Sequence, residues 1–156
     1  MPHFDRNNYP VEQSLGHLIA LINQLKDRIL ERHLSDHELT AAQFKVVLLM
    51  NRRFASTPAE LCRALSLDSG AMTRMLDRLE TKGLLRRERS STDRRQVQLV
   101  LTDRGQALGE RVPEIAADSM NELTECLSAA EVSEFQRILT KMLSAADALP
   151  QPRGDA

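Results

Sequence analysis

The spacing of apolar residues changes from helical to alternating between residues 57 and 101, and no other feature restricts the fold of this chain as strongly. Residues 57–65 and 69–82 carry apolar side chains at helical intervals, and a turn of three residues separates them. Residues 84–89 can form a short strand, and residues 96–101 place alternate apolar side chains on one face. Two short helices joined by a tight turn and followed by a β-hairpin are the parts of a winged helix-turn-helix.

Residues at the ends of these short helices support their boundaries. Thr57-Pro58-Ala59-Glu60 combines a capping hydroxyl, a proline at the first helical position and a glutamate at the third. Gly83 stands where the second helix should end with a residue in the left-handed conformation. Residues 90–95, between the predicted strands, are polar and include Arg94 and Arg95. The pattern therefore predicts a hairpin with a basic tip.

A long helix is predicted from Val11 to Leu34. Its apolar residues recur at alternating intervals of four and three, as in a coiled-coil seam, and a second apolar stripe includes Ile19 and Leu30. A helix that is apolar on two sides has two surfaces to cover. One of them is a candidate contact with a second subunit, and the alternative is burial within the same chain.

Three further helices complete the predicted fold. Residues 40–53 form a helix capped by Thr40, and residues 103–127 form a helix in which Pro113 should cause a kink or a split. A capping box at Ser128 begins the last helix. The fold class is therefore mainly α with a small β-hairpin wing, and residues 149–156 are expected to form a disordered tail.

The charge of the chain is distributed unevenly. The 156 residues suffice for one domain, and aromatic residues make up only 3%, so the core must consist mainly of aliphatic residues and methionine. Residues 40–101 hold 12 Lys and Arg against 6 Asp and Glu, whereas the rest of the chain holds 9 against 16. A basic middle between acidic ends indicates contact with a polyanion, and the alternative is a surface that is uneven by chance.

The sequence offers little support for an enzyme, a metal site or a membrane protein. It contains no phosphate loop, dinucleotide fingerprint or HExxH motif, and we expect no catalytic residues and no cofactor. Cys62 and Cys126 form no CxxC or Cys/His pattern, so neither a structural disulfide nor a zinc site is expected. Residues 1–10 lack the apolar region of a signal peptide, and no apolar run approaches the length of a membrane span. We therefore expect a cytoplasmic protein.

The second short helix has a face that suits a DNA groove. Arg74 has the length and the fork geometry to reach guanine edges, and Thr73 can contact a phosphate or a thymine methyl group. Arg78 is expected to contact the DNA backbone or to pair with Asp77 or Glu80. The alternative is an ordinary solvated helix face.

The hairpin tip supplies a second candidate contact. An arginine at the end of a β-ribbon can enter a narrow minor groove, where the negative potential is concentrated. Asp93 can hold Arg95 in an extended conformation through a charge-assisted hydrogen bond.

Several segments resemble the MarR (multiple antibiotic resistance regulator) family. They are Leu39–Phe44, Leu67–Glu80, Lys82–Leu84, and Asp93-Arg94-Arg95 leading to Leu101-Thr102-Asp103-Arg104-Gly105. The resemblance extends over residues 11–147, and it is strongest to the MarR repressor branch of the family.

The resemblance implies a homodimer in which residues 11–34 and 103–147 pair across a two-fold axis, while residues 40–101 bind a pseudo-palindromic operator in double-stranded DNA. Many such proteins are repressors released by phenolic or aromatic carboxylate effectors. Pro58, Thr73 and Arg87 match positions that surround a carboxylate ligand, although Arg87 could equally contact a phosphate. Taken together with the helix face and the hairpin tip, the candidate DNA contacts are Gln43, Lys45, Ser66, Ser69, Thr73, Arg74, Arg78, Asp93, Arg94 and Arg95.

The chain departs from two branches of this family. Peroxide-sensing members carry a cysteine in the first helix, and the most similar branch has one where Thr81 stands, but this chain has neither. Cys62 lies beside Arg63, so thiol-based redox sensing through Cys62 is an alternative function, although buried, inert thiols are expected at Cys62 and Cys126. A winged-helix protein-interaction module is a further alternative.

Overall fold

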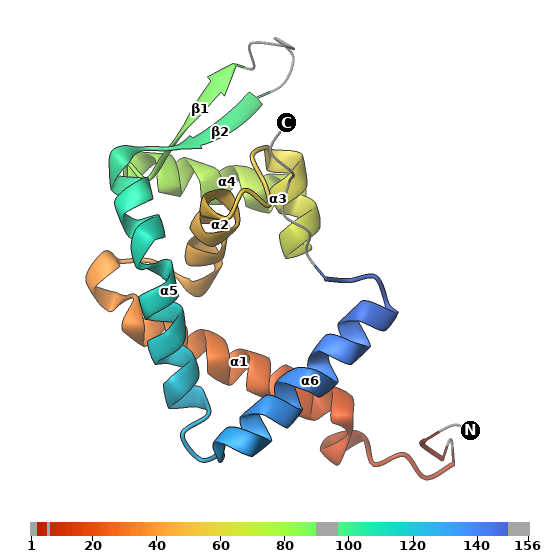
Figure 1. The fold of residues 1–156 in the computed structure, drawn as a ribbon. Coiled ribbons are helices and arrows are strands. Elements are labelled where there is room, and N and C mark those ends of the chain that lie inside the picture. Colours follow the sequence, from red (N-terminus) through yellow and green to blue (C-terminus); the bar gives the residue numbers. More distant parts are fainter. Residues whose placement is uncertain (1–2, 6, 90–96, 150–156) are drawn as a thin grey trace.

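A computed structural model describes residues 3–5, 7–89 and 97–149, and most of this part of the chain is helical (Figure 1). The two strands form an antiparallel hairpin, so the predicted fold class is confirmed. None of the described helices is long and apolar enough to cross a membrane. Short 3-10 turns cover Val11–Gln13 and Ser35–His37, and the longer elements are α1 (Leu15–His33), α2 (Ala41–Asn51), α3 (Pro58–Leu65), α4 (Ser69–Thr81), β1 (Leu85–Arg89), β2 (Val97–Leu101), α5 (Asp103–Leu123) and α6 (Ala129–Ala145).

The helices begin where the capping residues predict. Thr57 and Ser128 each form a reciprocal capping box with the glutamate three residues later, and Thr40 does the same with Gln43. These side chains satisfy backbone N–H groups that have no partner inside the helix. The predicted left-handed residue after α4 is also confirmed, because Gly83 has φ 66°.

The first helix begins later than predicted. The side chain of Ser14 accepts the backbone N–H of His17 at 3.1 Å, and Ser14 itself has an extended backbone. Because Ser14 occupies the capping position, α1 starts at Leu15 and Val11–Gln13 forms a separate 3-10 turn. The prediction of one helix from Val11 was therefore wrong at its start.

Pro113 does not split α5. A proline removes the hydrogen bond that its N–H would give to the carbonyl four residues earlier, which here belongs to Gly109. The side-chain amide of Asn51, at the end of α2, donates to this Gly109 carbonyl at 2.9 Å. A Cβ atom at position 109 would lie 2.7 Å from the Asn51 side chain, so glycine is required for this close approach.

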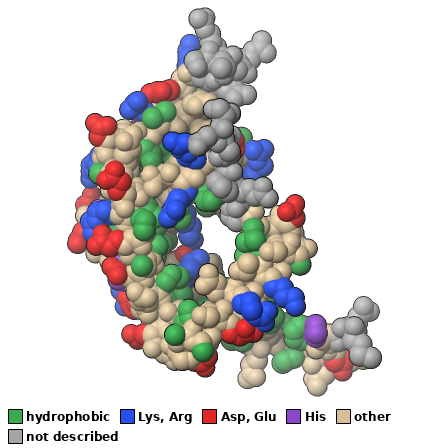
Figure 2. All heavy atoms as spheres, viewed as in Figure 1, with side chains coloured by type: hydrophobic (Ala, Val, Ile, Leu, Met, Phe, Trp, Pro, Cys, Tyr) green, Lys and Arg blue, Asp and Glu red, His purple; other side chains and the backbone are tan. Residues whose placement is uncertain are grey.

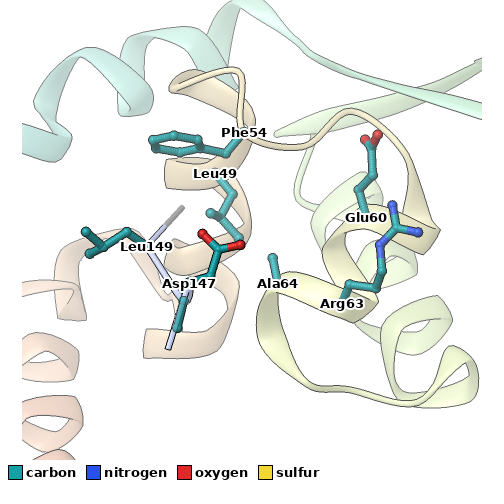
Figure 3. A pocket seen from close by; sticks show the side chains of 8 residues that line it. Leu49, Phe54, Glu60, Arg63, Ala64, Asp147 and Leu149 are labelled. Carbon is teal, nitrogen blue, oxygen red and sulfur yellow. The ribbon is translucent and has the colours of Figure 1, made fainter. Parts of the chain in front are cut away.

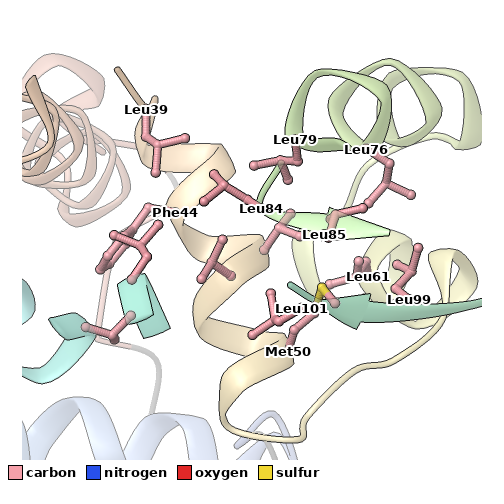
Figure 4. Close-up of a cluster of buried hydrophobic side chains, with 14 of the residues drawn as sticks. Leu39, Phe44, Met50, Leu61, Leu76, Leu79, Leu84, Leu85, Leu99 and Leu101 are labelled. Carbon is pink, nitrogen blue, oxygen red and sulfur yellow. The ribbon is translucent and has the colours of Figure 1, made fainter. Parts of the chain in front are cut away.

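A single core of aliphatic side chains joins α2 to the hairpin and to α3 and α4. Figure 4 shows α2 beside the leucines of α4 and of the two strands. Helices α3 and α4 each contribute one face, because apolar residues recur at helical intervals along them, whereas α2 is apolar on most sides and lies within the core. The largest fully buried side chains include Phe44, Leu34, Leu61, Met72, Leu76, Leu79 and Leu85.

The hairpin is tied directly to the start of α5. Leu85 pairs with Leu101 at the base of the hairpin, and the N–H of Thr102 donates to the carbonyl of Leu84 at 3.1 Å. A Cβ atom at Gly105 would lie only 1.9 Å from the same carbonyl oxygen. This contact explains physically why the Thr102-Asp103-Arg104-Gly105 segment needs glycine at its end.

The helices at the two ends of the chain leave apolar surface uncovered. No residue of α6 is buried, and Phe135 and Met142 are 45% and 51% exposed. The N-terminal half of α1 is similar, with Leu18 at 54%. Figure 1 shows α6 extending from the end of α5, and Figure 2 shows an opening between this arm and the rest of the molecule.

Candidate nucleic-acid interface

Helices α3 and α4 form the predicted helix-turn-helix. The turn between them consists of Ser66, Leu67 and Asp68, and Ser66 has a left-handed backbone with φ 52°. In this conformation the carbonyl of Cys62 accepts the N–H of Leu67 at 3.0 Å, which ends α3. The turn changes the direction of the chain, and α4 begins at Ser69, directly after it. In Figure 1, α4 lies below the base of the hairpin.

The orientation of α4 follows from its apolar stripe. Met72, Leu76 and Leu79 are at most 1% exposed, and Met75 packs against the same core, as the sequence predicts. The opposite face is therefore directed to solvent. Its exposed residues are Ser69, Thr73, Arg74, Asp77, Arg78 and Thr81.

Asp68 fixes the first turn of α4. Its carboxylate accepts the N–H of Ala71 at 2.8 Å. This hydrogen bond, together with one from Gly70 and the positive charge of Arg74, holds the pKa of Asp68 below its ordinary value although desolvation acts in the opposite direction. The carboxylate is therefore ionised at neutral pH and stabilises the start of the helix.

Arg74 and Arg78 place two positive charges on this face. Neither guanidinium group forms an ion pair or a hydrogen bond with any residue that the structure describes. Thr73 is exposed beside them, and its hydroxyl donates to the carbonyl of Ser69 at 2.8 Å, which leaves the oxygen able to accept. The structure therefore brings Ser69, Thr73, Arg74 and Arg78 together on one surface.

Arg87, in β1, neutralises the acidic residues of α4. Its guanidinium donates to Glu80 at 2.5 Å and to Asp77 at 2.7 Å, and its backbone N–H donates to Glu80 at 3.1 Å. Of the two alternatives for Arg78, the pair with Asp77 or Glu80 does not form, because Arg87 reaches both carboxylates from the neighbouring strand. Contact of Arg78 with the DNA backbone stays a prediction. The ion pairs of Arg87 join the hairpin to α4.

The pocket that contains Pro58 does not bring together the three residues assigned to an effector. Pro58 lies in the wall of a pocket of about 640 Å³. The other lining residues are Thr57, Ala59, Glu60 and Arg63, at the start of α3 and along it, and Val97 and Gln98 of β2. Neither Thr73 nor Arg87 is among the residues that line this pocket. The charge of Arg87 is also compensated by two carboxylates.

Gln43 and Lys45 are held within the protein. Gln43 is 4% exposed, and its side-chain oxygen accepts the N–H of Thr40 at 3.2 Å and a hydrogen bond from Lys82 at 3.4 Å. Lys45 is half-buried and pairs with Asp27 of α1 at 2.9 Å. Burial alone would raise the pKa of Asp27, but its bonds to Lys45 and Lys26 outweigh this effect and lower the pKa.

The basic tip of the hairpin lies outside the described residues, and with it Asp93, Arg94 and Arg95. The strand that leads to the tip carries cations that the sequence analysis did not single out. Arg89 is exposed, and Arg86 is exposed and pairs with Glu88 at 2.6 Å. The Leu85–Arg89 sequence, with three arginines in five residues, was the signal for them.

The two cysteines occupy different surroundings. Cys62 is half-buried and packs against the core, whereas Cys126 is exposed in the turn between α5 and α6. The expectation that Cys126 is buried was wrong, because α5 ends at Leu123 and the turn faces solvent. Within the described ranges, no three His, Cys, Asp or Glu residues are grouped so that they could hold a metal ion.

A further pocket of about 490 Å³ lies between α3 and the segment that follows α6 (Figure 3). Its walls carry charges of both signs, since Arg63 lies on one side and Asp147 on the other. Leu49, Phe54 and Leu149 supply the apolar part of the lining. The end of the described chain therefore lies beside the first helix of the helix-turn-helix.

Comparison with known proteins gives consistent matches. The model of the MarR family matches residues 39–97. The multiple antibiotic resistance protein MarR of Escherichia coli (strain K12) is 43% identical over 130 residues, which cover 83% of this chain and 90% of the relative. A solved structure of a mutant MarR from E. coli complexed with operator DNA has a TM-score of 0.71 at 46% identity, over 83% of this chain and 93% of that one. The structure of Bordetella bronchiseptica BpsR, described for regulation of its DNA binding by 6-hydroxynicotinic acid, has a TM-score of 0.72 at 29% identity, over 86% and 96%.

Proposed function

This chain belongs to the MarR family of transcriptional regulators, and we propose that it is a homodimeric, sequence-specific DNA-binding regulator and not an enzyme. In this proposal it acts in the cytoplasm as a repressor. The exposed face of α4 carries the proposal, because its two arginines form no ion pair or hydrogen bond with the described residues. Ser69, Thr73, Arg74 and Arg78 contact the major groove, and Ser66 lies at the turn before them.

The charges around α4 support binding to DNA. Arg74 can donate two parallel hydrogen bonds to one guanine, and Arg78 lies one turn further along the same face. Arg87 compensates Asp77 and Glu80, which would otherwise repel phosphates near this face. Arg94 and Arg95 are proposed to enter the minor groove, with Asp93 holding Arg95 in an extended conformation. Gln43 and Lys45 are proposed to act through the position of α2, since both side chains have partners within the protein.

The uncovered apolar surface supports a dimer. The exposed side chains of α1 and α6 include Leu15, Leu18, Ile22, Phe135, Ile138, Leu139 and Met142, and soluble monomers rarely expose so much contiguous apolar surface. Pairing of α1, α5 and α6 with the same helices of a second subunit covers this surface. It also places two α4 helices on successive turns of a pseudo-palindromic operator, about 34 Å apart.

A small aromatic or phenolic effector is proposed to release the DNA. The DNA binding of the related BpsR is regulated by 6-hydroxynicotinic acid, an aromatic carboxylate. An effector acts by binding more tightly to the arrangement of the dimer that does not fit the operator.

Binding of the purified protein to the DNA upstream of its own coding region tests the proposal. Footprinting should show a protected pseudo-palindrome, and the affinity for this site should exceed that for random duplex by about 10³-fold or more. Affinity should fall steeply as salt rises from 50 to 200 mM, because bound phosphates release counterions. Equal affinity for the two duplexes would disprove sequence-specific regulation, and no binding at low salt would favour a protein-interaction module.

A further inference from the structure

The hairpin has one face that changes from buried to exposed along its length. This inner face consists of three cross-strand pairs, namely Leu85 with Leu101, Arg87 with Leu99, and Arg89 with Val97. Leu85 at the base is 1% exposed, whereas Val97 is 41% exposed and Arg89 is also exposed. The hydrophobic core therefore ends near Arg87, and the inner face continues beyond it into solvent.

Helix α4 lies on the side of this inner face. Arg87 reaches α4 from it, since its guanidinium donates to Asp77 at 2.7 Å and to Glu80 at 2.5 Å. Alternate residues of a strand point to the same side, so the side chain of Arg89 leaves β1 on the side of α4 as well. The residues between them in the sequence, among them Arg86, point to the opposite side of the hairpin.

Arg89 lies between the two parts of the protein that are proposed to enter DNA. It is two residues beyond Arg87, about 7 Å further along the strand. It also directly precedes residues 90–95, the predicted hairpin tip. In Figure 1, β1 begins near the end of α4 and rises away from the helix, so Arg89 is the residue of β1 that lies farthest from this junction.

The geometry of duplex DNA determines what this position faces, and this step rests on the proposed function. A major groove and the adjacent minor groove are separated by one sugar–phosphate strand. When α4 lies in the major groove and the hairpin tip in the minor groove, β1 must pass over that strand with its inner face toward the phosphates. The residue of the inner face between Arg87 and the tip is Arg89.

The charge of Arg89 is available to a phosphate. Its guanidinium forms no ion pair or hydrogen bond with any residue in the described ranges, and its cross-strand partner Val97 carries no charge that could compete. The other arginines of β1 differ, because Arg87 is compensated by two carboxylates and Arg86 pairs with Glu88 at 2.6 Å. Arg89 therefore combines a place on the inner face with a charge that no described residue compensates.

We propose that Arg89 binds the phosphate strand between the two grooves and that it fixes the position of the hairpin relative to α4 on the duplex. A guanidinium group can donate two parallel hydrogen bonds to one phosphate. Phosphate contacts position a protein on the duplex but carry no sequence information. Arg89 therefore adds affinity for any duplex, whereas Arg74 is proposed to select a base pair.

Salt titrations of DNA binding test this contact. The probes are the duplex protected in footprinting and a random duplex, and the proteins are the wild type and Arg89→Gln, which lacks the charge. We expect Arg89→Gln to lose about tenfold in affinity for both duplexes, so that the ratio of the two affinities is unchanged. The slope of log K against log salt should become less steep by about 0.9 for each phosphate contact, or about 1.8 for a dimer.

Two variants serve as controls. Arg86→Gln removes the same charge from the same strand, but on the opposite side and from an existing ion pair, so it should change the salt slope much less. Arg89→Lys keeps the charge and should retain most of the slope. Thermal unfolding of each variant shows whether it is folded, so a change in DNA binding can be assigned to the side chain.

Uncharged phosphates locate the contact. In a series of operator duplexes, one phosphate at a time is replaced by a methylphosphonate, which carries no charge. At one phosphate in each half-site, the replacement should weaken binding of the wild type but not that of Arg89→Gln, because the variant has already lost the contact. This phosphate should lie at the edge of the major groove whose base pairs respond to Arg74→Ala.

Four results would overturn the contact. They are a salt slope of Arg89→Gln equal to that of the wild type, an equal change of slope in Arg86→Gln, a larger loss of affinity at the operator than at the random duplex, and the absence of any phosphate whose replacement affects only the wild type. If the wild type binds its operator specifically and one of these results is obtained, only the role of Arg89 is wrong. If the wild type binds neither duplex, the proposed function fails and this contact fails with it.

Discussion

Arg74 and Arg87 lie on neighbouring elements, but their surroundings give them different roles. Arg74 is exposed and has no ion-pair partner among the described residues, whereas Arg87 forms ion pairs with Asp77 and Glu80. An arginine whose charge is already compensated gains less from a phosphate or a guanine than one whose charge is not. The difference lies in the neighbours of each residue and not in its type.

Arg74→Ala should therefore reduce specific binding. Loss of a paired contact to guanine should cost about 1–3 kcal/mol at the operator and relax the preference for one base pair. Fluorescence anisotropy with the operator and with single base-pair variants measures both effects. Arg137→Ala, which removes an arginine from α6, should bind like the wild type, and an unchanged base preference in Arg74→Ala would show that Arg74 does not contact a base.

Asp68 should make the stability of the protein depend on pH in a defined range. The hydrogen bond from Ala71 lowers the pKa of Asp68 below its ordinary value of 3.8. The resulting stabilisation is present above pH 3.8 and is lost as the pH falls through the lower pKa of the folded protein. Asp68→Asn keeps a capping side chain that does not titrate.

Urea unfolding of wild type and Asp68→Asn between pH 3 and pH 6 checks this prediction. The difference in free energy of unfolding should be constant near pH 6 and should shift in favour of the asparagine variant below pH 3.8. A difference that does not change with pH would show that the carboxylate contributes nothing as a charge.

At the scale of elements, the junctions between helices depend on contacts that join distant parts of the chain. The Asn51 amide at the end of α2 binds the Gly109 carbonyl that Pro113 leaves without a partner in α5. Arg87 joins β1 to α4 in a similar way. The Asn51 contact joins the DNA-binding lobe to α5, and the Arg87 contacts join the hairpin to α4 within the lobe.

Asn51→Ala should destabilise the protein by about 1–3 kcal/mol, because the buried carbonyl of Gly109 then has no donor. In a Pro113→Ala background, the restored N–H of residue 113 can donate to this carbonyl, so the same change should cost much less. Chemical unfolding of the four proteins gives the coupling energy between positions 51 and 113. Equal costs in the two backgrounds would contradict this account of the proline.

At the scale of the whole molecule, the main feature is that the apolar stripes of α6 and of the N-terminal half of α1 are not buried within the described part of the chain. Residues 11–25 of the N-terminal segment and the stripe on α6 follow helical spacing, yet they remain exposed. The apolar residues of α4 follow the same helical spacing, but α4 is buried on one face. The proposed second subunit accounts for this difference.

Leu139→Glu should dissociate the proposed dimer. Leu139 lies in the apolar stripe of α6, and burial of an unpaired carboxylate there should raise the dimer dissociation constant by about 100-fold or more. Thr140→Glu introduces the same charge at the next residue, on the polar side of α6, and should leave the dimer intact. Sedimentation velocity over a dilution series measures the association, and a monomeric wild type would disprove the dimer.

The amino-acid sequence alone determined the elements and the direction of their faces. Thr57, Asp68 and Ser128 satisfy N–H groups only three residues away, and the apolar period of α4 defines its outward face without reference to the rest of the fold. Such short-range effects are visible in any window of the sequence. This is why the helix-turn-helix and the surface with Thr73 and Arg74 could be predicted.

Only the tertiary structure decided which polar groups meet. The partners of Arg87, Lys45 and the Gly109 carbonyl lie between 7 and 58 residues away along the chain, and no local pattern specifies them. A pocket lined by Arg104 likewise exists only because three distant segments converge on one face of α5. Long-range contacts depend on how all the helices pack together, so their chemistry becomes visible only when the chain is folded.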